Sequence, residues 1–230
     1  MPGVKKRGKP IVIWGARGQA LVLADMLPYR GYRIVAFFDN DPAVESPVHG
    51  VPIHHGQRGL THWLAGAARR GSVSFAVAIG GDRGRDRLKI QSLLIASGLR
   101  PATLVHPSSI VARTATLGEG CQVLAGSVIG PGAVLGAAVI VNTSASVDHE
   151  CALADGTHIG PGAVLAGCVK VGTCAFVGAG AVVVPRISIG HDACVGAGAV
   201  VIDDVVARAV VVGNPASPLR RTRRRPTSSR

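Results

Sequence analysis

The second half of the chain places an aliphatic residue at every sixth position. From Val105 to Val201, seventeen consecutive positions with this spacing are all valine, isoleucine or leucine. The residue four positions after each of them is small or β-branched, from Ser109 to Val205. This period is typical of a parallel β-helix, in which each hexad forms a short strand and a corner and the aliphatic side chain points into the prism. Three hexads close one triangular coil of 18 residues, so the pattern predicts between five and six stacked coils.

The first hundred residues follow a different pattern, in which apolar strands alternate with helical segments. Strands are expected at 10–14, 33–38 and 73–79, and helices at 21–27 and 82–97. This alternation predicts a small parallel α/β sheet of Rossmann-like type. The predicted organisation is a basic leader at 1–9, a Rossmann-like domain at 10–100, a β-helix at 104–206 and a C-terminal segment with a basic tail at 207–230.

A glycine turn follows the first predicted strand and marks a candidate ligand site. Gly15 and Gly18 form an incomplete dinucleotide fingerprint, in which glycine lets the backbone approach a phosphate at the start of the next helix. Asp39 ends the second strand, where its carboxylate is placed to accept a hydrogen bond from a sugar hydroxyl, and Gly80 follows the third. The turn favours a nucleotide or nucleotide sugar, with a tight structural turn as the alternative. Intact NAD binding is disfavoured because Ala20 stands near the place of the third fingerprint glycine.

His149 lies in the part of the repeat that is most crowded with polar and acidic residues, from Asn142 to Cys151. It comes two residues after an aliphatic position, so we expect its side chain to project outward from a corner. Because strand alternation breaks at a corner, Glu150 can reach the imidazole and raise its basicity. The segment therefore predicts a histidine general base, with a purely structural corner as the alternative. Cys151 falls on an inward position and is expected in the core.

Coil arithmetic places further residues beside this histidine. Gly167 comes 18 residues after His149 and should stack directly over it, about 4.8 Å away along the axis. A glycine leaves the corner open, and its backbone N–H becomes a candidate oxyanion donor. Pro161, Ala179 and Ala197 form a second column of small corners, along which a long thin ligand can lie.

The formal charge of +12 is concentrated at the two ends of the chain. Ten basic residues lie in the leader and tail, which leaves 15 basic against 13 acidic residues in the body. No aromatic residues alternate with the tail arginines, so no specific nucleic-acid partner is predicted. No apolar run approaches the roughly 20 residues of a membrane span, and the start lacks the apolar core of a signal peptide. Five cysteines, an odd number, favour reduced thiols and a cytoplasmic location.

Two other functions are alternatives to an acyltransferase for a protein with this predicted β-helix. One is a zinc enzyme like the γ-carbonic anhydrases, which needs three histidines that converge at a subunit interface. His149, His158 and His191 are not separated by whole coils, so we predict no metal. The other is a non-catalytic scaffold that binds a sugar nucleotide in its first domain.

His54 and His55 are expected as exposed loop residues.

The segments NTSASVDHECALADGTHIGPGAVLAGCVKVG (142–172), VGAGAVVIDDV (195–205) and VVGNPA (211–216) resemble a known family. They are similar to the bacterial sugar O- and N-acetyltransferases of hexapeptide-repeat type, among them UDP-4-amino-sugar and perosamine N-acetyltransferases and sialic-acid O-acetyltransferase-like proteins. The resemblance implies a left-handed parallel β-helix, a homotrimer, and acetyl-CoA in the grooves between subunits. It also implies direct N-acetylation of a nucleotide-linked 4-amino-4,6-dideoxy sugar, with O-acetylation of a sugar or sialic acid as the alternative.

The same resemblance implies roles for particular residues. His149 matches the general base and Glu150 the acid behind it, while His158 and Gly167 match residues near the thioester. Ala179 and Ala197 match positions whose backbone touches acetyl-CoA. The nucleotide-sugar pocket is matched by Gly15, Arg17, Gly18, Gln19, Asp39, Asn40 and Gly80. Gln19 replaces a histidine and Asn40 an acidic residue found in some relatives, which leaves the identity of the sugar and nucleotide open.

Overall fold

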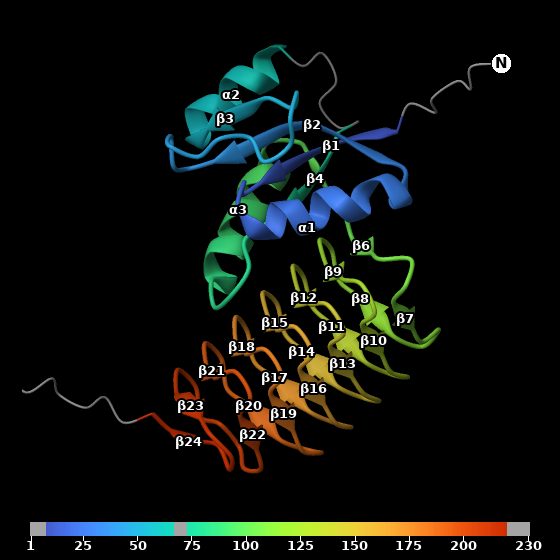
Figure 1. Ribbon diagram of the computed structural model, residues 1–230, viewed down its shortest axis with the longest axis vertical. Coiled ribbons are helices and arrows are strands. Elements are labelled where there is room, and N and C mark those ends of the chain that lie inside the picture. The colour runs from blue at the N-terminus through green and yellow to red at the C-terminus, as the bar shows by residue number, and fades with distance from the viewer. Residues whose placement is uncertain (1–7, 67–72, 220–230) are drawn as a thin grey trace, which may run out of the picture.

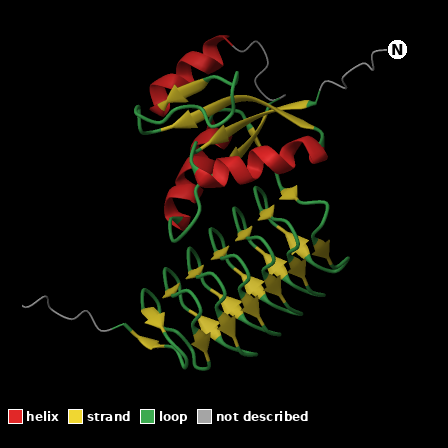
Figure 2. Ribbon diagram, viewed as in Figure 1, coloured by secondary structure: helices red, strands yellow, loops and turns green. Residues whose placement is uncertain are grey.

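The computed structural model describes residues 8–66 and 73–219, and it consists of an α/β domain set against a long triangular prism (Figure 1). Helices occur only in the α/β domain, whereas the described part of the prism is built from short strands and turns (Figure 2). Lys5, Lys6, Arg7 and the tail arginines lie outside the described residues. Among the described segments, every helix is too short or too polar to cross a membrane.

The α/β domain contains a five-stranded parallel sheet with the order β3-β2-β1-β4-β5, as expected for a Rossmann-like half. Its strands are β1 (Lys9–Trp14), β2 (Tyr32–Asp39), β3 (Ile53–His55), β4 (Ser74–Val77) and β5 (Arg100–Pro101). Its helices are α1 (Gly18–Met26), the 3-10 helix η1 (Leu27–Arg30), α2 (Gly56–Gly66) and α3 (Gly84–Ala96). The three strands and two helices predicted from the sequence are all present, and α1 begins three residues before the predicted position 21.

Two short strands were not predicted, and one of them corrects the interpretation of the histidines. His54 and His55 belong to β3, at the edge of the sheet, and are half-buried instead of lying in an exposed loop. The His54 ring stacks on Phe38, and burial, together with the charges of His62 and His55, lowers the pKa of His54. A run of only three residues with two histidines carries too little apolar pattern to predict a strand.

The two faces of the sheet bury different partners. Val12, Trp14 and Phe38 point toward α2 and α3, where they form one apolar cluster. Ile13 and Phe37 point the other way, toward α1. That second cluster continues through α1 into the outer side of the prism, where it includes Leu104, Leu124 and Ile140. The α/β domain is therefore docked on the prism through apolar contact.

The prism is a left-handed parallel β-helix, as predicted. Seventeen two-residue strands follow one another, and each ends on one of the predicted aliphatic residues. The strands are β6 (Leu104–Val105), β7 (Ile110–Val111), β8 (Thr116–Leu117), β9 (Gln122–Val123), β10 (Val128–Ile129), β11 (Val134–Leu135), β12 (Ile140–Val141), β13 (Ser146–Val147), β14 (Ala152–Leu153), β15 (His158–Ile159), β16 (Val164–Leu165), β17 (Lys170–Val171), β18 (Phe176–Val177), β19 (Val182–Val183), β20 (Ser188–Ile189), β21 (Cys194–Val195) and β22 (Val200–Val201).

Each strand from β6 to β19 pairs in register with the third strand after it, 18 residues further along the chain. Ile129, for example, pairs with Val147. The result is three sheets, which form the faces of the prism. We call them the covered face (β6, β9, β12, β15, β18 and β21, under the α/β domain), the valine face (β7, β10, β13, β16, β19 and β22) and the third face (β8, β11, β14, β17 and β20).

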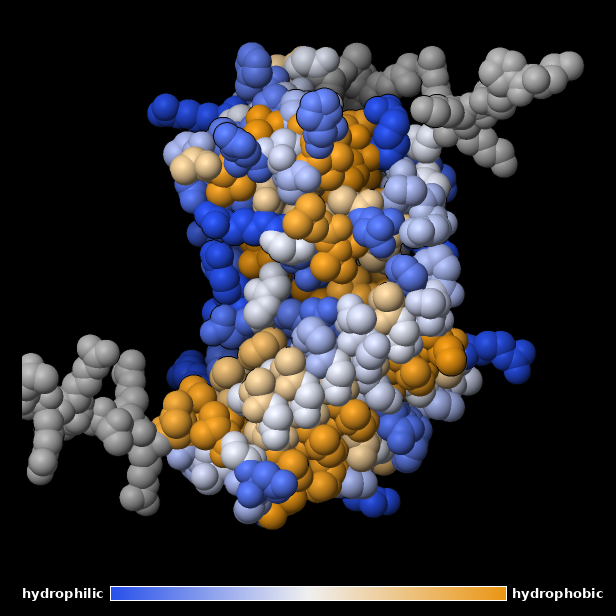
Figure 3. Space-filling view, viewed as in Figure 1, coloured by the Kyte–Doolittle hydropathy of each residue, from blue (hydrophilic) through white to orange (hydrophobic). Residues whose placement is uncertain are grey.

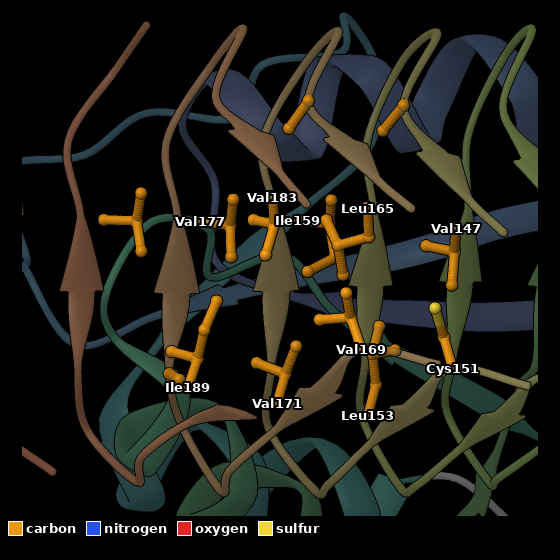
Figure 4. Packing of buried hydrophobic residues seen from close by; sticks show 14 of the residues in the cluster. Val147, Cys151, Leu153, Ile159, Leu165, Val169, Val171, Val177, Val183 and Ile189 are labelled. Atoms are coloured by element: carbon orange, nitrogen blue, oxygen red, sulfur yellow. The ribbon is translucent and has the colours of Figure 1, made fainter. Parts of the chain in front are cut away.

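Inside the prism, the aliphatic residues of successive coils pack on one another together with the small residues of the corners (Figure 4). Cys151 is fully buried in this core beside Val147 and Leu153, which confirms its predicted inward position. The last parallel strand, β23 (Val210–Val212), lies beyond residue 206, where the β-helix was expected to end. It pairs Val211 with Val195, so the final coil is shorter than 18 residues, and β24 (Ser217–Pro218) follows antiparallel to it.

One buried arginine of α3 fixes the α/β domain to the prism. The Arg87 guanidinium is fully buried and donates hydrogen bonds to the carbonyls of Ala138 (2.8 Å), Ile79 (2.7 Å), Gly156 (2.5 Å) and Thr157 (3.2 Å). Burial lowers the pKa of Arg87 to about 10, so it stays charged near neutral pH. Because these carbonyls would lose their partner if the domain moved, the contact holds the two parts in one arrangement.

Candidate active site

His149 occupies a corner of the prism between β13 and β14, and its side chain is 52% exposed. The backbone N–H of His149 donates to the Asp148 carboxylate (2.6 Å), which fixes the corner. Glu150 has a left-handed backbone conformation (φ 56°), and this turns its carboxylate back toward the preceding ring. Glu150 Oε2 lies 3.2 Å from His149 Nδ1, so the two adjacent side chains meet as the sequence predicted.

This contact determines which ring nitrogen is available. With Nδ1 donating its proton to the carboxylate, the neutral imidazole has its lone pair on Nε2. The arrangement can accept a proton at Nε2 while the carboxylate stabilises the resulting imidazolium. The corner thus has the parts of a histidine–acid general base.

Gly167 stacks over His149 as the coil arithmetic predicted. A Cβ atom at position 167 would collide with the imidazole, and Nε2 is its nearest atom, so only glycine leaves room for the ring. The register is held by a hydrogen bond from the Cys168 N–H to the His149 carbonyl (2.9 Å). Within residues 8–66 and 73–219, no acceptor is found for the Gly167 N–H, so it is available to a ligand.

His158 lies in a contrasting environment on the covered face. It is only 4% exposed, and its Nδ1 contacts the Gly81 carbonyl (3.2 Å) while its Nε2 contacts the Asn142 side-chain amide nitrogen (3.1 Å). Burial, reinforced by the charge of Arg87, lowers the pKa of His158 to about 4. The ring is therefore neutral near pH 7, donates from Nδ1 and accepts at Nε2.

A single chain does not bring His149 and His158 together. His158 lies on the covered face, whereas His149 lies at the corner between the other two faces. Pro161, Ala179 and Ala197 stack at the corner between the covered face and the valine face, linked by hydrogen bonds from Gly180 to Pro161 and from Gly198 to Ala179 (both 2.8 Å). Of the residues matched to acetyl-CoA, Gly167, Ala179 and Ala197 therefore fall on the two corners that flank the valine face, and His158 lies on the covered face.

The predicted nucleotide pocket is a cavity of about 280 Å³ at the carboxyl ends of β1 and β2. Of the matched residues it is lined by Gly15, Arg17, Asp39 and Asn40, together with Arg83 of the segment before α3. Gly15 has a φ of 99°, and a Cβ there would meet the Ala78 carbonyl at 2.5 Å, so this glycine is required by the turn itself.

The carboxylate of Asp39 also stabilises the loop around it. Its two oxygens accept hydrogen bonds from the backbone N–H groups of Ala16 and Asp41 (both 3.0 Å). Arg17 pairs with the Asp41 carboxylate at 2.7 Å. Asp41 and Arg83 were not predicted from the sequence, although both follow strand ends, where such a cavity forms.

Three matched residues lie outside the lining of this cavity. Gln19 donates from Nε2 to the Gln122 side chain (2.9 Å), and Gln122 donates to the Val77 carbonyl (2.8 Å). An ideal Cβ on Gly80 would lie 3.5 Å from the His158 ring and 3.8 Å from Gln19 Oε1. Gln19 and Gly80 therefore face the domain interface near His158, and Gly18 opens α1 without lining the cavity.

The described structure also has a broad groove away from these residues. A groove of about 770 Å³ runs along the third face, where Val134, Ala152, Lys170 and Ser188 line it. None of the predicted site residues borders it, and its breadth reflects the small residues of a flat sheet. The candidate site is therefore the histidine corner and not this groove.

Within the described residues of one chain, the histidines do not converge on a single point. His191 pairs with Asp192 (2.9 Å), which also binds Arg85 of α3, and His158 is held under the α/β domain. Among the described residues, the one group of three metal-binding side chains is His149, Glu150 and Cys168, whose ligand atoms lie within 4.8 Å of one another. This is not the three-histidine arrangement of a γ-carbonic anhydrase.

Stacked hexapeptide coils are the fold of the hexapeptide-repeat acyltransferases, and the comparisons with known proteins agree with this class. Residues 10–91 match the family model of the PglD N-terminal domain. The chain is 36% identical to PerB from Caulobacter crescentus, solved with CoA and GDP-perosamine (91% of this chain, 97% of that chain, TM-score 0.83). It is 32% identical to the acetyltransferase domain of PglB from Neisseria gonorrhoeae, solved with acetyl coenzyme A (92% and 100%, TM-score 0.81).

A variant of the Caulobacter crescentus perosamine N-acetyltransferase with one histidine replaced by asparagine, solved with CoA and GDP-perosamine, is 35% identical (91% and 96%, TM-score 0.83). No curated protein matches the chain. The chain belongs to the hexapeptide-repeat sugar acetyltransferase family. It is accordingly an enzyme that transfers acetyl groups to sugars, with acetyl-CoA as cosubstrate.

Proposed function

We propose that the chain transfers the acetyl group of acetyl-CoA to the amine of a nucleotide-linked 4-amino-4,6-dideoxy sugar, with His149 as general base. The observation that carries the proposal is the contact between His149 Nδ1 and Glu150 Oε2 at 3.2 Å, which leaves Nε2 as a proton acceptor at an open corner. The similarity to perosamine N-acetyltransferase, solved with GDP-perosamine, favours an amine over a hydroxyl as the acceptor.

In the proposed reaction, the sugar amine attacks the thioester carbonyl carbon and transfers a proton to His149 Nε2. The carbon–sulfur bond then breaks, and the CoA thiolate takes the proton from the imidazolium, so the base returns to its starting state. Glu150 stabilises the imidazolium, and the Gly167 N–H donates to the oxyanion of the tetrahedral intermediate. Attack is direct because Cys151, the adjacent thiol, is buried in the core and burial raises its pKa.

The valine face supports a homotrimer. Ile110, Val128, Val164 and Val182 repeat along it at outward positions, and Ile110 is 67% exposed. Figure 3 shows apolar surface interrupting the polar covering of the β-helix. Aliphatic side chains repeated along one face, interrupted by Ser146 of β13, are unusual for a monomer. Three copies packed through this face around one axis would cover it completely.

This assembly would also complete the active site. The His149 corner lies on one side of the valine face and the Pro161–Ala197 column on the other. In a closed ring of three, the His149 corner of each subunit meets the opposite corner of its neighbour. Acetyl-CoA would lie in that groove with its thioester near Gly167, and the neighbour's covered face would bring its own His158 region close.

The α/β domain is the proposed nucleotide-sugar site. The start of α1 favours a phosphate, and Arg17 and Arg83 border the cavity with positive charge. Asn40 lines it as well, in place of an acidic residue of some relatives.

The five unpaired cysteines agree with a cytoplasmic location, where thiols stay reduced.

The test is a screen of nucleotide-linked amino sugars with acetyl-CoA, followed by the mass of the acetylated sugar. GDP- and UDP-linked 4-amino sugars are each compared with the matched 4-hydroxy sugar. The proposal predicts acetylation of at least one 4-amino sugar and a much lower rate with its hydroxyl counterpart. Transfer only to hydroxyl sugars would make the protein an O-acetyltransferase, and a mass near 23.4 kDa in sedimentation would contradict the trimer.

A further inference from the structure

We propose that His149, Glu150 and Cys168 form a binding site for Zn²⁺, through which the metal reversibly inhibits the enzyme. The existence of this site depends only on the three side chains, whereas the inhibition rests on the proposed function of His149. Nothing in the catalytic proposal uses Cys168, which lies one coil above Glu150.

Two of the three distances between the ligand atoms already lie close to the spacing that zinc requires. Glu150 Oε2 is 3.2 Å from His149 Nδ1 and 3.7 Å from Cys168 Sγ. In tetrahedral zinc sites with Zn–N and Zn–O near 2.1 Å and Zn–S near 2.3 Å, such ligand atoms are roughly 3.4–3.6 Å apart. All three ligand atoms lie within 4.8 Å of one another, so small side-chain rotations bring the three donors onto one ion.

The backbone holds these donors in place. Glu150 and Cys168 both adopt left-handed conformations, with φ of 56° and 63°, so their side chains leave stacked corners in the same direction. The Cys168 N–H bonds to the His149 carbonyl at 2.9 Å, which fixes the third donor relative to the other two. The site is preorganised by the coil register and needs no rearrangement of the chain.

The donor chemistry selects a transition metal. One imidazole nitrogen, one carboxylate oxygen and one thiol sulfur suit Zn²⁺, while Mg²⁺ and Ca²⁺ prefer oxygen alone. His149 and Glu150 are exposed and Cys168 is partly exposed, so the ion has an entry path and a fourth position for water.

Binding at Nδ1 would remove the catalytic base. The metal takes the place of the proton that Nδ1 shares with Glu150, and the neutral imidazole then carries its proton on Nε2. Nε2 has no lone pair left for the acceptor amine, and Glu150 is no longer available to stabilise an imidazolium. The metal acts as an inhibitor, unlike the resident zinc of a metalloenzyme.

The site is tested first without any activity measurement. Chelator-treated protein is titrated with Co²⁺, whose bond to a thiolate gives a charge-transfer absorption band. Wild type is expected to show the band, Cys168→Ala and Cys168→Ser to lose it, and the control Cys194→Ala, another partly buried free thiol, to keep it. Absence of the band in wild type, or its persistence in both Cys168 variants, would overturn the proposal even if the enzyme were inactive.

The inhibition is tested next, with the acetylated sugar measured by mass because the CoA thiol binds zinc. Cys168→Ala is expected to keep the zinc-free rate of wild type and to need at least about tenfold more Zn²⁺ for half inhibition, as loss of a ligand weakens a metal site. Equal zinc sensitivity in wild type and Cys168→Ala would contradict the proposal.

Discussion

Two histidines of the same repeat lie in opposite environments, one at an exposed corner and the other buried under the α/β domain. At the exposed corner, His149 uses Nδ1 for the Glu150 carboxylate and leaves Nε2 free. Under the α/β domain, His158 uses both ring nitrogens, and burial with the charge of Arg87 lowers its pKa to about 4. The two residues are nine positions apart, so their places in the 18-residue coil decide which of them can exchange protons during turnover.

The largest effect is expected when the free imidazole is removed. His149→Ala should lower kcat by about 10²–10⁴, the usual contribution of a general base, while acetyl-CoA affinity stays nearly unchanged. Steady-state kinetics and calorimetry measure the two quantities separately. Turnover close to wild type would show that the corner histidine is not the base.

Protonation of the buried His158 should affect the stability of the fold. Because its pKa is lowered from 6.5 to about 4, the unfolded chain binds more protons than the folded one in this range. The contribution of His158 to the free energy of unfolding should therefore be complete above pH 6.5. It should be lost as the pH decreases toward 4, which lowers the free energy of unfolding by at most roughly 3 kcal/mol. Denaturant unfolding at several pH values checks this, and His158→Gln should flatten the decline. An unchanged slope in the variant would contradict the assignment.

A smaller loss of activity is expected when Glu150, the partner of the His149 imidazole, is replaced. Glu150→Gln keeps the shape of the side chain but removes the charge that stabilises the imidazolium, a hydrogen bond worth about 1.5–3 kcal/mol. We expect kcat to fall about 10- to 100-fold, less than for His149→Ala, with little change in KM for acetyl-CoA. A loss equal to or greater than that of His149→Ala would indicate a different role for Glu150.

The smallest effect on activity is expected at the neighbouring thiol. Cys151 follows Glu150 in the chain but points into the core. Cys151→Ala should keep nearly full activity, and mass spectrometry of wild type during turnover should show no acetyl-enzyme. An acetylated Cys151 would replace direct transfer with covalent catalysis.

The repeat explains why so much of the exposed corner could be predicted from the sequence. An aliphatic residue every six positions sets the strands, and the 18-residue coil then places Gly167 over His149 without further information. The meeting of His149 and Glu150 follows from the broken alternation at a corner. Local periodicity and a regular backbone are sufficient for these features.

The buried region could not be predicted because it depends on docking between domains. The segment around Arg87 has the charged pattern of an exposed helix, yet its guanidinium is fully buried because carbonyls of distant corners accept its hydrogen bonds. The burial of His158 and the contact of Gln19 with Gln122 arise in the same way. No local pattern in the chain encodes which outer face of the prism the α/β domain covers.

The central claim is that His149 takes the proton of the acceptor, and the pH dependence of one ratio tests it most directly. The ratio of kcat for wild type to kcat for His149→Ala is measured over the pH range in which both proteins stay folded. Protonation of the acceptor amine affects both rates and cancels. The account predicts that the ratio falls as the pH decreases, because only wild type loses a base by protonation. A ratio that stays constant with pH would contradict the account.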